Sequence, residues 1–195
     1  MESSENLHAK GSVSSFDIVL RPIGIIKNNI KKPMLVTKDD GIKMDGQMAD
    51  AIKKYHETRN EVSKIVIHEK WIEIIDSIEE YSHLVVLYWA HKVPEKSRSV
   101  TKVHPMGRED LPKVGIFGTC SPARPNPVLM TIVRLCGRKK NMLEVTGLDA
   151  VDGSPVIDIK PYVKEFYPQE EITIPEWMEC ILREVDRVIS KREMH

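Results

Sequence analysis

The sequence predicts a mainly β protein with added helices, built as a barrel or a sandwich of short strands and ending in an amphipathic helix. An unbroken apolar run at residues 84–90 is typical of a strand buried on both faces. Further short runs of β-forming residues, separated by turn residues, lie at 114–119, 130–136, 142–145 and 156–159. Over residues 175–192, apolar side chains recur at helical spacing: Met178, Ile181, Leu182, Val185, Val188 and Ile189.

The N-terminal part predicts little regular structure. Residues 1–15 are polar, and we expect them to form a disordered leader, with the fold beginning at Phe16. Residues 16–26 predict a strand in which Pro22 and Gly24 mark an edge position or a bulge. Residues 27–46 predict a loop.

The middle of the chain alternates between helical and extended patterns. Residues 47–64 have an apolar face at helical spacing and predict a short helix. Residues 65–67 and then 72–75 predict a strand and a turn, and the long apolar strand spans 82–91. Residues 92–113 are polar, contain three prolines and predict a long loop, a feature that is often functional in a compact domain.

Composition narrows the class of protein. At 195 residues and 41% hydrophobic content we expect one main domain, residues 16–165, followed by a helical extension at 166–195. Lys plus Arg equal Asp plus Glu, so any RNA contact must use a local patch. The cysteines Cys120, Cys136 and Cys180 form no Cys-x-x-Cys pair, which favours reduced thiols in the cytoplasm. No apolar run approaches the roughly 20 residues of a membrane helix, so we expect no membrane partner.

One segment stands out chemically: Gly115-Ile-Phe-Gly-Thr-Cys-Ser-Pro-Ala-Arg-Pro-Asn-Pro127. Its three prolines fall within six residues and fix the backbone, so the loop is pre-shaped. Such a loop can present the guanidinium of Arg124 and the amide of Asn126 to a planar polar ligand. The alternative is a proline-rich turn in which Arg124 pairs structurally.

This segment and three others resemble, in the same order, the TsaA/TrmO-like family. The other three are Arg21-Pro-Ile-Gly24, then Tyr81-Ser-His-Leu84 leading to Trp89-Ala-His91, and then Leu148 to Tyr162. The resemblance covers residues 16–162. It implies a small single-sheeted β-barrel, a homodimer, and S-adenosylmethionine bound near the dimer interface. It also implies N6-methylation of threonylcarbamoyl-adenosine next to the anticodon of a tRNA.

The resemblance also implies functional residues. Those that match the family's cofactor site are His91, Lys92, Cys120, Met130, Thr146, Gly147, Leu148 and Asp149. The catalytic set is Asp149, Arg124 and Asn126, and the substrate- or RNA-binding set is Arg108, Arg124 and Lys160. Methyl transfer from a sulfonium is an in-line displacement, so we expect no metal. The general base stays open among Asp149, His91 and His104.

Alternative interpretations stand beside these assignments. His91 could be a strand-end histidine satisfied by backbone, and Arg108 could lie in a solvated basic loop. Asp149, Asp152 and Asp158 could be turn or cap residues, and we favour a turn role for Asp152 and ligand contact for Asp149.

The sequence departs from the family at Cys120, where the family has an arginine with five hydrogen-bond donors. The family's Pro-Arg-Gln element after the first strand has no clear counterpart, and Val128 and Leu129 replace Ile-Gly. Two further hypotheses follow: a same-fold methyltransferase with a small-molecule or other nucleoside acceptor, and a noncatalytic ligand- or RNA-binding module.

Overall fold

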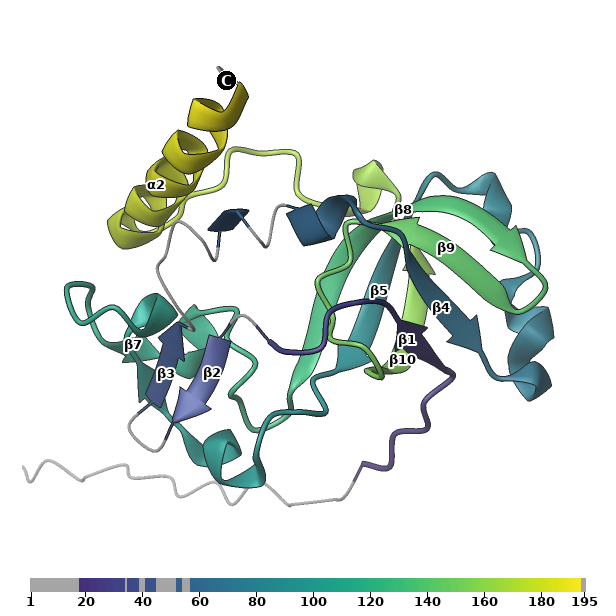
Figure 1. Cartoon of the computed structure of the whole chain (residues 1–195), viewed down its shortest axis with the longest axis horizontal. Coiled ribbons are helices and arrows are strands. Elements are labelled where there is room, and N and C mark those ends of the chain that lie inside the picture. Colours follow the sequence, from purple (N-terminus) through teal and green to yellow (C-terminus); the bar gives the residue numbers. More distant parts are fainter. Residues whose placement is uncertain (1–17, 34, 39–40, 45–51, 54–56, 194–195) are drawn as a thin grey trace, which may run out of the picture.

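The computed structural model describes residues 18–33, 35–38, 41–44, 52–53 and 57–193, and its centre is a closed antiparallel barrel (Figure 1). Around the barrel the strands follow the order β1-β10-β5-β8-β9-β4, with β4 closing onto β1. Their bounds are β1 Gly24–Lys27, β4 Ser63–Ile67, β5 His83–Trp89, β8 Val128–Lys139, β9 Met142–Thr146 and β10 Pro155–Pro161. The single-sheeted barrel implied by the resemblance is therefore confirmed.

Alternation of side chains along the strands builds the core. On β5, Leu84, Val86 and Tyr88 point inward, while Val85 and Leu87 belong to the other face. Its neighbours pair with it in register, Val86 opposite Thr131 of β8 and Ile159 of β10. The buried residues that fill the interior are Ile26, Ile65, Ile67, Ile75, Leu84, Val86, Tyr88, Val133, Leu143, Val145, Leu148, Ala150 and Val156.

Barrel closure depends on close approach between β1 and β4. A Cβ at Gly24 would lie 2.4 Å from the backbone oxygen of Val66, so only glycine lets the two strands pair here. This is the physical reason for a glycine in the first strand. Pro22 lies outside the ladder, because residues 18–23 form no strand.

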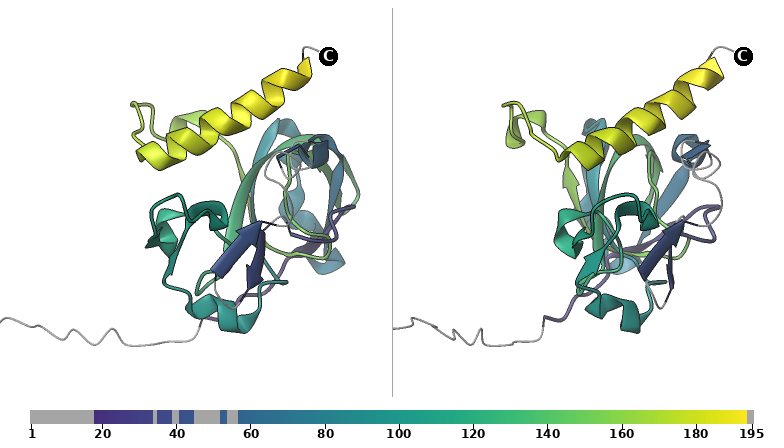
Figure 2. Two further views of the ribbon diagram at one scale, coloured as in Figure 1. Left: turned by 60° about the vertical axis from the view of Figure 1, so that its left-hand side comes forward. Right: turned by 90° about the vertical axis from the view of Figure 1, so that its left-hand side faces the viewer.

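A second region packs beside the barrel and carries the signature loop. It contains the hairpin β2 Leu35–Lys38 and β3 Gly41–Met44, and the short pair β6 Lys102–Val103 and β7 Val114–Gly115. The C-terminal helix α2, Glu176–Glu193, lies over this region (Figure 1). Both views of Figure 2 place the N-terminal end of α2 nearer the small sheets than its C-terminal end.

Several predicted elements are confirmed and others are wrong. The strands at 65–67, 82–91, 130–136, 142–145 and 156–159 and the C-terminal helix are present, with shifts of a few residues at their ends. The predicted loop at 27–46 instead contains the β2–β3 hairpin. The prediction missed it because two strands of four residues show too little alternation of apolar and polar residues in the sequence. The predicted strand at 16–26 shrinks to β1, and Phe16 lies outside the described residues.

Other corrections concern tight turns. Residues 72–75 belong to a 3-10 helix, Glu69–Ile75, whose Ile75 is buried against the barrel core. The predicted strand at 114–119 becomes two residues of β7 followed by a 3-10 turn, Ile116–Gly118. The long loop at 92–113 contains β6 and two further 3-10 turns. The predicted helix at 47–64 is helical at 52–53 and 57–60, its remainder up to residue 56 lies outside the described residues, and β4 already begins at Ser63.

The leader predicted for residues 1–15 also lies outside the described residues. Within the described part of the chain, no helix is both long and apolar enough to cross a membrane.

Candidate functional site

Asp149 lies where the chain leaves β9 and passes β8, and two hydroxyl groups hold its carboxylate. The Tyr88 hydroxyl donates to Oδ1 over 2.9 Å, and the Thr131 hydroxyl donates to the same oxygen over 2.6 Å. In the described part of the chain no residue bonds the other oxygen, Oδ2. Asp149 is thus oriented by one oxygen and can accept hydrogen bonds from a ligand with the other.

The segment before Asp149 runs beside the first half of β8, whose other edge pairs with β5. Gly147 adopts φ 88°, which favours glycine, and its N–H donates to the carbonyl of Arg59 over 2.7 Å. An added Cβ at Gly147 would lie 3.6 Å from the backbone oxygen of Ile132, so the segment runs directly beside β8. Leu148 is fully buried in the core, so it can offer a ligand only backbone groups.

His91 follows β5 and contacts the turn before β10. Its Nδ1 lies 3.2 Å from the Ser154 hydroxyl, and a Cβ on Gly153 would lie 3.7 Å from its Nε2. Partial burial and then the charge of Lys92 lower the pKa of His91, while Asp152 acts in the opposite direction. His91 is therefore neutral at physiological pH and can accept a proton or a hydrogen bond.

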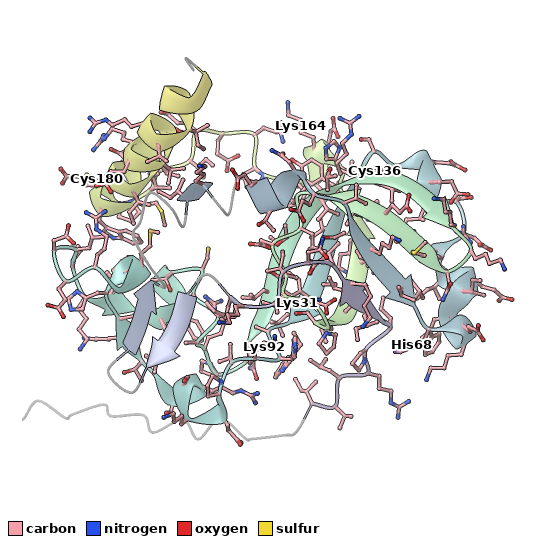
Figure 3. The ribbon with its side chains drawn as sticks, viewed as in Figure 1. Lys31, His68, Lys92, Cys136, Lys164 and Cys180 are labelled. Atoms are coloured by element: carbon pink, nitrogen blue, oxygen red, sulfur yellow. The ribbon has the colours of Figure 1, made fainter. Side chains whose placement is uncertain are left out.

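The turn around Asp152 is fastened to the loop after β1. The side chain of Asp152 accepts from the backbone N–H of Asn28 over 3.0 Å and from Nζ of Lys31 over 2.9 Å. These contacts lower the pKa of Asp152, the Lys31 contact contributing most. Lys92 in turn donates to the carbonyl of Lys31, and the two lysines lie together in Figure 3. The turn role expected for Asp152 agrees with Gly153 at φ 82°.

The signature loop is held by its own arginine. Arg124 donates from Nε to the carbonyl of Ser121 over 2.8 Å and from Nη2 to the carbonyl of Thr119 over 2.5 Å. Its guanidinium also lies over the exposed ring of Phe117, 5.9 Å from the ring centre. In this structure Arg124 therefore pairs structurally, the alternative that the sequence left open, and the prolines and the arginine together fix the loop.

The other predicted site residues occupy separate places. Cys120, Asn126 and Met130 are exposed, and Met130 lies on the outer barrel face, opposite to the inward Thr131. Arg108 forms ion pairs with Asp110 and with Glu184 of α2, which raise its pKa. Lys160 is paired with Asp158, and Thr146 is half-buried at the end of β9. In the described residues no hydrogen bond or ion pair joins Arg124 or Cys120 to Asp149.

Tyr88 and Thr131 are the polar residues that sequence patterns missed. Both lie at inward positions of paired strands, where apolar residues are expected. A hydroxyl at such a position needs a hydrogen-bond partner, and this requirement is the signal that could have indicated a nearby acceptor. Across the described ranges no group of three or more His, Cys, Asp and Glu could hold a metal ion.

Comparisons with known proteins identify the same family as the sequence motifs. Residues 49–167 match the family described as tRNA-methyltransferase O N-terminal domain. A protein of Methanothermobacter thermautotrophicus named probable S-adenosyl-L-methionine-binding protein is 39% identical over 155 residues, covering 78% of this chain and 96% of that protein. An S-adenosyl-L-methionine-binding protein of Archaeoglobus fulgidus is 37% identical over 148 residues, covering 76% and 91%. The Arg21–Gly24 motif lies before the matched residues.

Two further comparisons are more distant. A mouse tRNA (adenine(37)-N6)-methyltransferase is 34% identical over 97 residues, covering 50% of this chain and 22% of that enzyme. The crystal structure of TrmO from Pseudomonas aeruginosa superposes with a TM-score of 0.60 at 21% identity, covering 85% of this chain, which spans 63% of that structure. It supports the barrel fold. The family match over more than half of the sequence, together with the archaeal relatives, shows that the chain belongs to the TsaA/TrmO-like family.

Proposed function

We propose that this protein transfers the methyl group of S-adenosylmethionine to an adenine of tRNA. The structural observation that carries the proposal is the carboxylate of Asp149, held through one oxygen by Tyr88 and Thr131 at the end of the barrel. Relatives that cover three quarters of the chain are named S-adenosyl-L-methionine-binding proteins, and the mouse relative is named for adenine N6-methylation.

The residues around Asp149 fit this cofactor. S-adenosylmethionine carries hydroxyl and ammonium donors, and Oδ2 of Asp149 is an acceptor with no described partner. The backbone of residues 146–149 runs beside β8, and a Cβ added at Gly147 would lie 3.8 Å from the Arg59 guanidinium. We therefore assign cofactor binding to this segment, with His91 and Lys92 at the neighbouring turn.

When bound, the cofactor would supply an electrophilic methyl group on its sulfonium: the new N–C bond to the exocyclic amine would form as the S–C bond breaks, leaving the neutral thioether and a proton for removal from the acceptor nitrogen. The protein's own part is to orient the two reactants and to exclude water. His91 is neutral at physiological pH and lies against the turn before β10, and we assign it as the base candidate. Asp149, whose carboxylate is held by two hydroxyl donors, serves binding better than proton removal.

The finer assignments belong to the same proposal. We assign the acceptor as threonylcarbamoyl-adenosine next to the anticodon, on the resemblance of the signature segment to the TsaA/TrmO-like family. A homodimer is supported by the exposed apolar outer face of β8, where Met130 is 60% and Ile132 is 37% exposed. Such an enzyme belongs in the cytoplasm, where tRNA is modified.

A second acceptor class has a specific observation in its favour. Cys120 stands where the family has a permanently charged arginine, and the net charge of the chain is zero. A small molecule or free nucleoside, which has fewer phosphates than tRNA, would need less positive charge at the site.

The first test is calorimetric titration of the full chain with S-adenosylmethionine, followed by methyl transfer to tRNA. We expect micromolar binding and tRNA labelling, with both reduced at least tenfold in Asp149→Asn. The matched control is Asp158→Asn, which changes a half-buried aspartate on β10 that pairs with Lys160. Absence of cofactor binding would overturn the proposal. Binding with labelling of nucleosides but not of tRNA would replace the acceptor with the second class.

A further inference from the structure

Helix α2 forms one wall of a cavity beside the signature loop. The cavity measures about 180 Å³. The long loop contributes Val103 to Met106, the signature loop contributes Thr119 to Ser121, and α2 contributes Trp177, Met178 and Ile181. Cys120 is among these lining residues, and by the resemblance its position belongs to the cofactor site. Residues 176–193 lie beyond the family match, so the family's barrel domain does not itself include the wall formed by α2.

We propose that α2 is a hinged lid, which opens to admit a ligand to this cavity and closes over the part of the ligand that stays there. The inference rests on the proposed function only for the nature of that ligand, S-adenosylmethionine or its product. The size of the cavity favours movement, because about 180 Å³ is below the roughly 300–1,000 Å³ of pockets for drug-sized ligands. With α2 in place, the cavity therefore holds a part of such a ligand and not the whole.

The segment that joins α2 to the barrel can act as the hinge. All residues from Pro168 to Pro175 are exposed. In the described part of the chain, no backbone hydrogen bond links this segment to the barrel or to the two loops. Its start is anchored, because the side chain of Gln169 donates to the carbonyls of Lys164 and Tyr167 over 2.9 and 2.7 Å. Rotation of the backbone after this anchor would carry α2 as a unit and leave the barrel unchanged.

The contact between α2 and the rest of the protein is small. Of the α2 residues whose exposure the structure describes, Ile181 alone is buried. Trp177 and Met178 are half-buried at the cavity, and Leu182 is 48% exposed. In both views of Figure 2 the C-terminal half of the helix projects away from the small sheets. Opening therefore exposes one buried side chain, a small change compared with the unpacking of a core helix.

An ion pair at the edge of the cavity can act as the latch. Glu184 of α2 pairs with Arg108 of the long loop over 2.5 Å, and Asp110 holds the same guanidinium. The backbone N–H of Arg108 donates to the carbonyl of Pro105, a residue that lines the cavity. The arginine is thus fixed to the cavity wall on which α2 closes. Because the pair is partly exposed, breaking it costs little, which suits a lid that opens reversibly.

The closed lid changes the surroundings of a bound ligand. The side chains that α2 adds to the cavity are apolar, and the described residues that line it include no Lys, Arg, Asp or Glu. Cys120 stands where the family has an arginine, so the lining offers a ligand no charged partner. Enclosure by Trp177 and Met178 would then supply contact and exclude water from this side of the site.

Spin labels on two native cysteines test the lid in the full chain. Cys180 lies on α2 and Cys136 lies on the barrel strand β8, and Figure 3 marks both. In a Cys120→Ser background, nitroxide labels on these two thiols report the distance between helix and barrel by double electron–electron resonance. Glu184→Gln breaks the latch. The matched control is Glu179→Gln, which breaks the pair with Arg183 inside α2 and leaves the latch intact. The ligand probe is S-adenosylhomocysteine, whose binding is measured separately by calorimetry.

Two populations of distances are expected without ligand. Glu184→Gln should increase the open population about threefold, and Glu179→Gln should leave it unchanged. Saturating S-adenosylhomocysteine should shift the labels toward the closed population. A single distance that neither Glu184→Gln nor bound S-adenosylhomocysteine alters would overturn the lid and leave the proposed function standing. A shift in Glu184→Gln, in a protein that binds no S-adenosylhomocysteine, would keep the lid and remove the proposed function. Equal shifts in the two variants would indicate fraying of the helix and contradict the lid.

The fluorescence of Trp177 provides a second measurement in unlabelled protein. The Trp177 signal is the difference between the parent chain and Trp177→Phe, because Trp71 and Trp89 remain in both. Acrylamide should quench this signal less when S-adenosylhomocysteine is bound and more in Glu184→Gln. Quenching that is equal in the free, bound and Glu184→Gln proteins, with ligand binding shown by calorimetry, would contradict a moving helix.

Discussion

The hydroxyl of Tyr88 donates to the same carboxylate oxygen of Asp149 that the Thr131 hydroxyl bonds, over 2.9 and 2.6 Å respectively. Tyr88 and Thr131 come from the paired strands β5 and β8, so the barrel itself sets the orientation of Asp149. A loop residue is thereby oriented by two residues of the sheet, which is the support that a binding site needs.

Removing the Tyr88 hydroxyl tests whether this orientation matters. Tyr88→Phe is expected to raise the dissociation constant for S-adenosylmethionine about tenfold, because a hydrogen bond to a charged group contributes about 1.5–3 kcal/mol. Calorimetry gives the constant, and binding of tRNA should change less than threefold. Tyr81→Phe, at a 44% exposed tyrosine before β5, is the control and should leave both unchanged. Equal weakening of cofactor and tRNA would indicate general damage to the fold instead of a positioning role.

The barrel could be predicted because its strands carry strong patterns. The run at 84–90 and the alternation on β9 and β10 reflect burial directly, and the family resemblance then supplied closure into one sheet. The β2–β3 hairpin and the 3-10 turns could not be predicted, because short elements with few apolar residues depend on tertiary contacts. The resemblance located Asp149 but not its hydrogen-bond partners. Tyr88, Thr131 and Asp149 are far apart in the sequence and come together only when the strands pair.

The signature loop shows a different limit of sequence reasoning. Its prolines and Arg124 predicted a rigid loop, and hydrogen bonds within the loop do hold it. The guanidinium, however, donates these bonds to the carbonyls of Thr119 and Ser121. Composition cannot tell whether an arginine fork meets a ligand or its own backbone. The cavity beside Cys120 depends on α2, which comes more than fifty residues later in the chain.

The lowered pKa of His91 predicts how this residue affects stability as the pH changes. Because burial and Lys92 lower this pKa below its ordinary value of 6.5, the unfolded chain binds more protons at this site than the folded one as pH falls through that window. His91 therefore favours folding less as pH falls. Titration of His91 by NMR should give a midpoint below 6.5, and Lys92→Gln should move it upward by removing the nearby positive charge. A midpoint at or above 6.5 would contradict the environment described here.

Gly24 is expected to be essential for barrel closure. Gly24→Ala places a Cβ 2.4 Å from the backbone oxygen of Val66, and because backbone cannot rotate away, β1 and β4 must separate. The free energy of unfolding should fall by about 1–3 kcal/mol, measured by urea denaturation. Gly115→Ala is the control, because nothing lies within 4 Å of its added Cβ, and it should change stability by less than about 0.5 kcal/mol. Equal stability of the two variants would show that the strands can yield.

The ion pair between Arg108 and Glu184 is expected to fasten α2 to the long loop. The two side chains meet at 2.5 Å and are 24% and 36% exposed, so water screens them less than a fully exposed pair. A double-mutant cycle with Arg108→Gln and Glu184→Gln should give a coupling energy of about 1 kcal/mol in thermal or urea unfolding. The comparison pair lies on the same helix: Arg183 and Glu179 are 3.5 Å apart and more than half exposed.

That comparison cycle should give no more than about 0.5 kcal/mol, because the pair is exposed and one turn apart. Raising the salt concentration to about 1 M should weaken the exposed pair proportionally more. If α2 forms a wall of the cavity as the structure shows, Glu184→Gln should also speed alkylation of Cys120 without changing that of Cys136, since a loosened helix uncovers the thiol. Coupling energies that are equal in the two cycles, with unchanged labelling of Cys120, would mean that apolar contacts of Trp177, Met178 and Ile181 hold the helix without help from the ion pair.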